Sequence, residues 1–196
     1  MIELQNSSPR VLVIGDLMID HYLWGNCERI SPEAPVPVID IKSENSVLGG
    51  AGNVINNLQS LGAKVDVISI ISYSETSNKL QKLLTDINVD TNYLITQKNR
   101  TISKKSRIIA SQQQVVRYDQ ECTEDISIES QGLILDTFKK IIGNYEIILL
   151  SDYGKGVLTQ ELTKSLITIA NKHQKKVLVD PKGVDFSKYK GAYLLT

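Results

Sequence analysis

Carboxylates and lysines follow the predicted ends of several short apolar strands. The run RVLVIG, residues 10–15, is typical of a buried parallel strand, and Asp16 and Asp20 come after it. Two later strands end in SDYGKG (residues 151–156) and in DPKG (residues 180–183). Because open α/β sheets bind ligands at the carboxyl edge, these groups are candidates to hold sugar hydroxyls and phosphates. A helix N-cap is the simpler interpretation of Asp16.

A glycine pair, Gly49-Gly50, leads directly into a short helix. The apolar residues form one helical stripe and Gly62 stands where a C-terminal cap belongs, the stripe being Ala51, Val54, Ile55, Leu58 and Leu61. Glycines without a Cβ let a ligand approach the backbone, and the N–H groups of a first turn favour anions. Asn53 lies in this turn, off the stripe. A capped turn and a ligand site both fit this pattern.

Two extended runs, residues 104–111 and 115–119, predict a hairpin that carries four cations. The cations are Lys104, Lys105, Arg107 and Arg117. They could line a solvated strand face or form an anion pocket.

Two further extended segments, residues 22–30 and 36–41, lie between the first strand and the glycine-led helix, joined by a proline-restricted stretch. We expect them to form a small lid sheet, which the hairpin at residues 104–119 joins. The remainder alternates strands with helices, which predicts an α/β fold. The expected strands are residues 64–71, 89–96, 146–151 and 176–180, and the expected helices are residues 78–87, 128–142 and 159–172.

The composition excludes several classes of protein. The chain has 196 residues, of which 41% are hydrophobic, enough for one good core. Lys plus Arg and Asp plus Glu number 22 each, which argues against a nucleic-acid or membrane-surface partner. Cys27 and Cys122 lack metal-site spacing and indicate free thiols. The polar opening MIELQNSSPR is unlike a signal peptide, so we expect a cytoplasmic protein.

Several motifs together resemble the ribokinase-like (PfkB) carbohydrate kinases, most closely their heptose 7-phosphate kinase branch. The motifs are GDLMID at residues 15–20, RISPEAPVPV at 29–38, GGAGNV at 49–54, QQVVRYD at 113–119, LSDYGKG at 150–156 and the final VLVDPKGVDFSKYKGAYLLT. They extend over nearly the whole chain. The resemblance implies a parallel sheet flanked by helices, with a small β lid whose strands lie near residues 22–41 and 104–119.

The resemblance also implies an activity and a site. ATP and Mg²⁺ would be used to convert heptose 7-phosphate to heptose 1,7-bisphosphate for ADP-heptose and lipopolysaccharide core synthesis. Asp20 and Asn53 would bind sugar hydroxyls, with Gly49 and Gly50 giving close backbone approach and Asp152 near the sugar. Arg117, Lys155 and Arg107 would hold the existing phosphate. Asp180 and Lys182 would face the nucleotide phosphates.

The resemblance further implies a homodimer formed through the lid. Where family members carry glycine and aspartate after the second core strand, this chain has ISYSE at residues 71–75, so the shape of that loop stays open. A sugar-phosphate-binding protein without catalysis is the alternative function. A nicotinamide dehydrogenase is disfavoured because no G-x-G-x-x-G follows the first strand.

By resemblance, the general base, the anion hole and the adenine pocket are expected beyond Thr196, after a strand that begins at Ala192. The 196 residues would then be the N-terminal part of one kinase domain, without a catalytic residue of their own.

We therefore predict no appreciable phosphoryl transfer by the purified 196-residue chain, since general base catalysis alone is worth about 10²–10⁴-fold. An ATP-coupled assay with heptose 7-phosphate measures this. Turnover at the rate of a complete kinase would place the catalytic groups within these residues.

Overall fold

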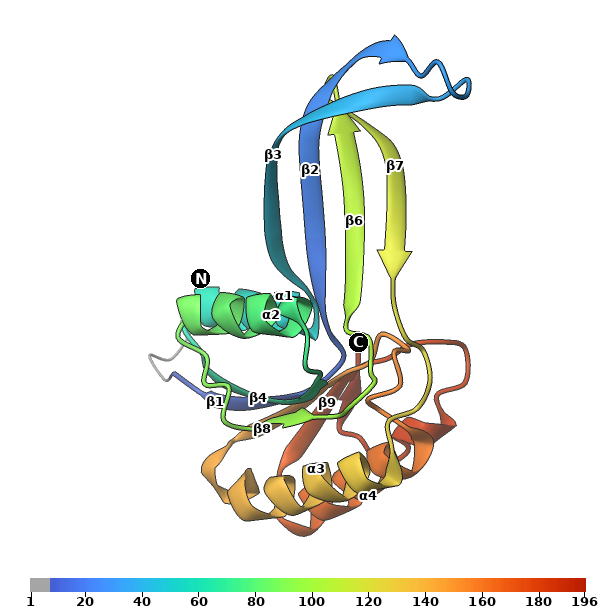
Figure 1. Cartoon of the computed structure of the whole chain (residues 1–196). Helices are drawn as coiled ribbons and strands as arrows, with labels where there is room; N and C mark the ends of the chain where they lie inside the picture. The colour runs from blue at the N-terminus through green and yellow to red at the C-terminus, as the bar shows by residue number, and fades with distance from the viewer. Residues whose placement is uncertain (1–7) are drawn as a thin grey trace.

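The computed structural model describes residues 8–196 and contains two sheets (Figure 1). The larger has six parallel strands in the order β10-β9-β8-β1-β4-β5. They are β1 (Arg10–Gly15), β4 (Lys64–Ile71), β5 (Leu94–Thr96), β8 (Ile147–Ser151), β9 (Lys176–Asp180) and β10 (Leu194–Leu195). The predicted α/β class is confirmed. Residues 1–7, on which much of the signal-peptide argument rests, lie outside the described residues.

Helices cover both faces of this sheet. In Figure 1, α1 (Ala51–Ser60) and α2 (Glu75–Asp86) lie on the face next to the second sheet, while α3 (Ile128–Ile141) and α4 (Gln160–Lys172) lie on the other. Short 3₁₀ turns occur at Ile142–Asn144 and Ser187–Tyr189. Among the described residues, no helix is long and apolar enough to cross a membrane.

Alternation along the strands divides the buried side chains into two cores. In β1, Leu12 and Ile14 belong to the core under α3 and α4, whereas Val11 and Val13 belong to the core under α1 and α2. All four are at most 3% exposed, which is why this strand has an unbroken apolar sequence.

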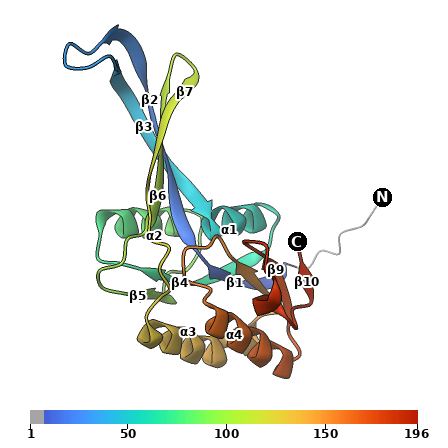
Figure 2. The same ribbon diagram turned by 90° about the vertical axis from the view of Figure 1, so that its right-hand side faces the viewer.

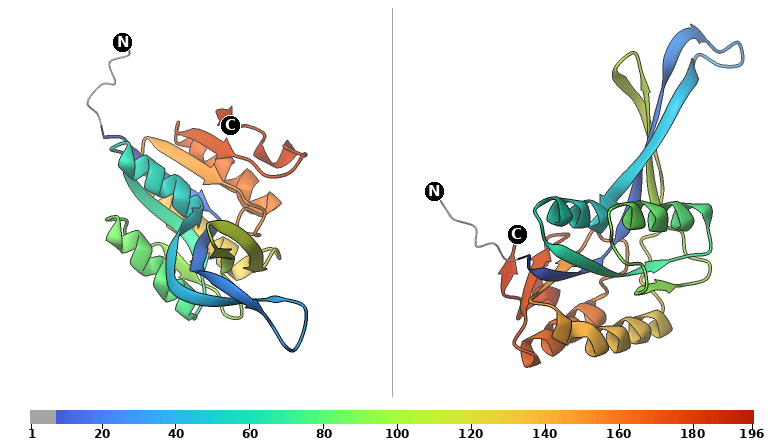
Figure 3. Two further views of the ribbon diagram at one scale, coloured as in Figure 1. Left: turned by 90° about the horizontal axis from the view of Figure 1, so that it is seen from above. Right: turned by 90° about the vertical axis from the view of Figure 1, so that its left-hand side faces the viewer.

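The second sheet has four strands in the order β3-β2-β6-β7, and we call it the lid. Its strands are β2 (Leu17–Ile30), β3 (Pro37–Gly50), β6 (Ser103–Ala110) and β7 (Gln113–Gln120). It extends well beyond the helical layer as a long, narrow, twisted sheet (Figures 2 and 3). The predicted hairpin is present, and its two-residue turn is formed by Ser111 and Gln112, both with positive φ.

The first two lid strands are longer than predicted. The expected ranges, residues 22–30 and 36–41, cover only part of β2 and β3. Only Asp16 separates β1 from β2, so this residue is not a helix N-cap. The alternation of β2 was obscured because its first residues are buried under α1 and α2 and are therefore mostly apolar.

The prediction of a strand over residues 89–96 was wrong for its first half, since β5 begins at Leu94. Asn88 has a φ of 59°, and the N–H of Val89 donates to the carbonyl of Leu84 to close α2. Asp90 then accepts from the N–H of Asn92 in a local turn. The Val89 side chain is only 1% exposed and packs in the core, which is why the residue is apolar although it does not pair in a sheet.

The last strand begins later than Ala192, where we expected its start. The N–H of Ala192 donates to the carbonyl of Tyr189 and so closes the preceding 3₁₀ turn, and β10 comprises only Leu194–Leu195. Thr196 extends the contact with β9, because its N–H and its hydroxyl both donate to the carbonyl of Val179, at 3.0 and 3.2 Å. Thr196 is therefore an edge residue of the large sheet, and the general base expected beyond it stays a prediction.

Helix α1 is confirmed, with one error in its stripe. Leu61 is 84% exposed, because it lies beyond the last helical turn. Gly62 has a φ of 89°, and the N–H groups of Gly62 and Ala63 donate to the carbonyls of Gln59 and Leu58, which is a Schellman ending. The predicted glycine cap is therefore correct.

Candidate functional site

The carboxylate of Asp16 organises the loop after β8. Asp16 is 1% exposed, and its oxygens accept from the backbone N–H groups of Tyr153 at 2.8 Å, Lys155 at 3.1 Å and Val157 at 3.1 Å. Burial raises the pKa of Asp16, and the three N–H groups oppose that rise. The end of β1 at Asp16 and the SDYGKG loop after β8 were predicted to lie at the same sheet edge, and they meet there. The role of Asp16, however, is to shape that loop.

Arg100, which the sequence did not single out, ties three segments together. It is 8% exposed, and its guanidinium donates to the carbonyls of Glu124, at 3.0 Å, and Lys155. The segment before β6, the connection from β7 to α3 and the β8–α4 loop therefore meet at one side chain. Gly156, with a φ of 81°, must lack a Cβ because a Cβ would lie 1.9 Å from the carbonyl oxygen of Glu124.

The glycine pair lies beneath the start of the lid. A Cβ on Gly49 would stand 2.5 Å from a carboxylate oxygen of Asp20, and one on Gly50 would stand 2.6 Å from the carbonyl oxygen of Asp16. Gly50 also has a φ of 55°, and the N–H of Ala51 donates to Asp16 O. The pair therefore allows the chain to pass from β3 into α1 directly under Asp20.

Two arginines face each other across β6 and β7. Arg107 pairs with Arg117 in the strand register, an arrangement of like charges that destabilises a sheet. Each has its own carboxylate. Arg107 donates to Asp20 at 2.5 Å and covers the ring of Tyr22, and Arg117 donates to both oxygens of Asp119, at 2.6 and 2.9 Å.

A second set of ion pairs joins the lid to the core. Lys105 contacts Asp119 at 3.0 Å and Glu121 at 3.2 Å, and Glu121 contacts Lys155 at 2.7 Å. Hydrogen bonds from Lys155 and Lys105 lower the pKa of Glu121 despite the opposing effect of burial. The hydrogen bonds from Arg117 lower the pKa of Asp119 well below its usual range. Both carboxylates are therefore anions at neutral pH.

One face of the lid carries five charged side chains, those of Asp20, Lys105, Arg107, Arg117 and Asp119. The register aligns Asp20 with Lys105 and Lys105 with Asp119, and residues two apart on a strand point to the same side. Of the predicted cations, Lys104 alone projects from the other face, where it lines a cavity with His21. Lys155 reaches the shared face from the core through Glu121.

Asp152, predicted to lie near the sugar, is a buried acceptor. It is 3% exposed and accepts from the N–H of Gly154 at 2.8 Å, the hydroxyl of Tyr189 at 2.7 Å and the ammonium of Lys188 at 2.5 Å. Although burial opposes it, the bond to Asp152 raises the pKa of Lys188. Tyr189 and Lys188 were not predicted as site residues, because a separation of 37 residues between Tyr189 and Asp152 conceals the contact.

Asp180 and Lys182 follow β9 at the same sheet edge. The backbone N–H of Lys182 donates to the Tyr189 hydroxyl at 3.2 Å, and the Lys182 stem lies beside Gly154. Burial raises the pKa of Tyr153, and the neighbouring Asp180 adds to the rise. The β8 and β9 loops are thus packed against each other.

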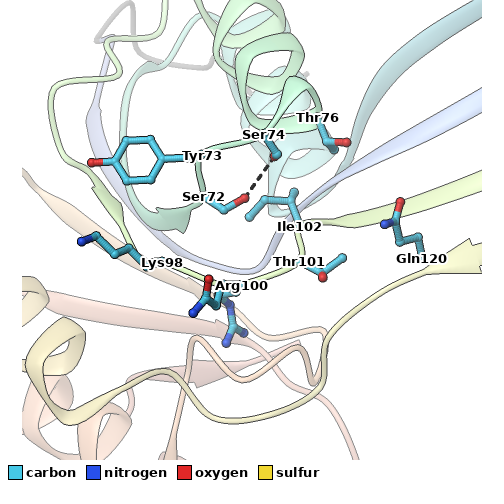
Figure 4. Close-up of a pocket in the computed structure, with 10 residues that line it drawn as sticks. Ser72, Tyr73, Ser74, Thr76, Lys98, Arg100, Thr101, Ile102 and Gln120 are labelled. Atoms are coloured by element: carbon cyan, nitrogen blue, oxygen red, sulfur yellow. Dashed lines mark hydrogen bonds between the residues drawn. The ribbon is translucent and has the colours of Figure 1, made fainter.

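Among the described residues, Asn53 forms no side-chain hydrogen bond with these groups. It is exposed on the first turn of α1 and lines a cavity of about 400 Å³ with residues of β3 and α2, among them Val47 and Leu83. A second cavity, of about 420 Å³, lies beyond the carboxyl end of β4 (Figure 4). Its wall includes the ISYSE loop, where Ser74 caps α2 by accepting from the N–H of Ser77.

The model of the pfkB family of carbohydrate kinases matches residues 8–194, so the chain belongs to that family. Among curated relatives, it is 61% identical over 191 residues to a protein of Aliarcobacter butzleri and 57% identical over 193 residues to one of Sulfurimonas denitrificans. Both are named "Bifunctional protein HldE". The chain is covered to 97% and 98%, and it spans about 40% of each relative.

Solved structures support the same fold. Ribokinase of Arabidopsis thaliana, complexed with ribose and ATP, has a TM-score of 0.64 at 14% identity over 96% of this chain and 60% of that one. Phosphofructokinase-2 of Escherichia coli, in its tetrameric inhibited form, has a TM-score of 0.65 at 18% identity over 92% and 57%. The predicted ribokinase-like fold is confirmed.

We predict that Asp16→Asn destabilises the chain by about 1–3 kcal/mol, because an amide nitrogen would face a backbone N–H where a carboxylate oxygen accepts. Urea unfolding measures the loss. Hydrogen exchange should show faster exchange at the amides of Tyr153, Lys155 and Val157. Asp136→Asn, an exposed change on α3, is the control and should stay within about 0.5 kcal/mol of the parent. Equal stabilities of the two variants would refute this role of Asp16.

Proposed function

We propose that this chain forms the sugar-phosphate-binding part of an ATP-dependent heptose 7-phosphate kinase. The product would be heptose 1,7-bisphosphate, an intermediate toward ADP-heptose and the lipopolysaccharide core. The observation that carries the proposal is the opposed pair Arg107 and Arg117 on the lid face that also bears Asp20. Membership of a carbohydrate kinase family supports catalysis over the alternative of a binding protein.

Asp20 would accept hydrogen bonds from sugar hydroxyls, and the missing Cβ of Gly49 lets the Asp20 carboxylate pack directly against the backbone there. Arg107 orients that carboxylate by its 2.5 Å bond and stacks on Tyr22. Asn53, in the first turn of α1, would also bind sugar hydroxyls. We assign Asp152 to the support of the loop beside the sugar, since its oxygens are already engaged by three donors.

Arg117 and Lys155 would bind the phosphate that the substrate already carries. Arg117 is the more exposed member of the opposed pair, with a side chain 45% exposed against 20% for Arg107. A guanidinium can bind two phosphate oxygens at once. The dianion would also relieve the repulsion between the two arginines, so its binding would remove a cost that the empty lid bears.

The nucleotide would lie at the carboxyl end of β9, where Asp180 and Lys182 stand. Lys182 offers an ammonium to phosphate oxygens. The described residues contain no group of three or more His, Cys, Asp or Glu able to hold a metal. Mg²⁺ fits such an edge only if the nucleotide supplies most of its ligands, which is its usual mode in phosphoryl transfer. ATP with Mg²⁺ would supply the transferred phosphoryl group.

The contribution of these residues to catalysis would be positioning, with the general base supplied from beyond Thr196. Asp20 and Asn53 would position the sugar, and the lid would exclude water. Binding of the substrate phosphate by Arg117 and Lys155 would set which sugar hydroxyl faces ATP. We place the reaction in the cytoplasm. The described cysteines, Cys27 and Cys122, are both free, as expected in a reducing compartment.

We also propose that the lid pairs with that of a second chain. Its strands expose apolar side chains, including Trp24, Val115, Val116 and Tyr118 at 43–50%, and its outer strand β7 has an unpaired edge. Light scattering at micromolar concentration should therefore give the mass of a dimer. A monomer mass across that range, unchanged by a charge substitution at Val116, would exclude this interface.

We predict that Arg117→Lys weakens binding of heptose 7-phosphate about tenfold while leaving unphosphorylated heptose within about twofold, because lysine cannot reproduce a bidentate contact. Fluorescence of Trp24, which lies on the lid beside Tyr22, provides the titration signal. Asn53→Ala is the comparator and should weaken both ligands by a similar factor. Equal losses for the two ligands in Arg117→Lys would make this arginine structural.

A further inference from the structure

The carboxylate of Glu121 lies between two ammonium groups from different parts of the molecule. Lys105, on lid strand β6, is 3.2 Å away, and Lys155, in the core loop after β8, is 2.7 Å away. Glu121 itself follows the end of β7, in the connection to α3. This side chain therefore joins lid and core by charge.

The backbone on either side of this contact is held. The N–H of Lys155 donates to Asp16, and its carbonyl accepts from Arg100. Arg100 also holds the carbonyl of Glu124, three residues after Glu121. The Lys155 ammonium can therefore change partners by rotation of its own stem, with no movement of the loop.

The local charges do not balance. Lys105, Lys155 and Arg117 surround only two carboxylates, Asp119 and Glu121. Asp119 is fixed by its place on β7 and by two bonds from Arg117. Glu121 lies outside the strand and its side chain is 30% exposed, so it is the carboxylate that an incoming anion can replace.

We propose that Glu121 is an internal counter-ion that occupies the place of the substrate phosphate and is displaced from Lys155 and Lys105 when a phosphorylated sugar binds. The inference rests on the proposed function, in which Arg117 and Lys155 hold that phosphate. Glu121 is thus a positioning residue. It keeps the two ammonium groups together in the empty site, and it competes with an incoming phosphate for them while leaving the binding of an unphosphorylated sugar unchanged.

The test compares Glu121→Gln with Glu124→Gln by isothermal titration calorimetry on the 196-residue chain at fixed ionic strength. Both changes remove one negative charge from the same connection. The Glu124 side chain is exposed, and the contact of this residue with Arg100 is made by its backbone carbonyl. The ligands are heptose 7-phosphate, unphosphorylated heptose and inorganic phosphate. Circular dichroism verifies that both variants fold.

Glu121→Gln should bind heptose 7-phosphate and inorganic phosphate roughly two- to fivefold more tightly than the parent, the range expected for loss of a partly exposed competing ion pair. Unphosphorylated heptose should bind equally to all forms, and Glu124→Gln should match the parent throughout. Inorganic phosphate that binds Glu121→Gln no better than Glu124→Gln, or binds neither, overturns the proposal. Tighter binding of inorganic phosphate with no preference for heptose 7-phosphate supports the counter-ion and refutes the proposed substrate.

Discussion

A single buried carboxylate determines how the two sheets of this protein meet. Asp16 lies between β1 and β2, and it holds the β8–α4 loop by three backbone N–H groups while its own carbonyl receives the N–H of Ala51. The start of the lid, the first turn of α1 and the SDYGKG loop are therefore fixed relative to one another by one residue. A carboxylate suits this position because it offers acceptors only, and its three hydrogen-bond partners are all backbone donors.

The lid departs from the rules that usually stabilise a sheet, and the departures are local. Arg107 opposes Arg117, and a row of charged side chains lines one face of the lid. Most natural sequences avoid such pairs unless a function requires them. Here each arginine is paired with a carboxylate of its own, which offsets part of the repulsion between the two cations.

The pattern of alternating strands and helices was predictable, because burial on both faces makes parallel strands apolar throughout. The glycine-led helix also followed from sequence, whereas Asp20, expected before the lid, belongs to lid strand β2. Four further residues were not predicted correctly. Leu61 was misleading because an apolar residue can be exposed, and Val89 was misleading because an apolar residue can be buried without belonging to a strand. Arg100 and Tyr189 were missed because their partners are the carbonyls of Glu124 and Lys155, and Asp152, all far away in sequence.

The contacts between lid and core differ in how readily a ligand could change them. Those of Asp16 and Arg100 involve backbone groups, are buried, and would leave unsatisfied donors or acceptors if broken. The contact of Glu121 with Lys155 involves two long side chains with 30% and 17% exposure, and water can replace either partner at little cost. A rigid joint beside an exchangeable ion pair allows a small anion to alter the electrostatics of the site without altering the fold. Ligand binding would then act first on side chains that already point at the open face, while the sheet edge beneath them keeps its geometry.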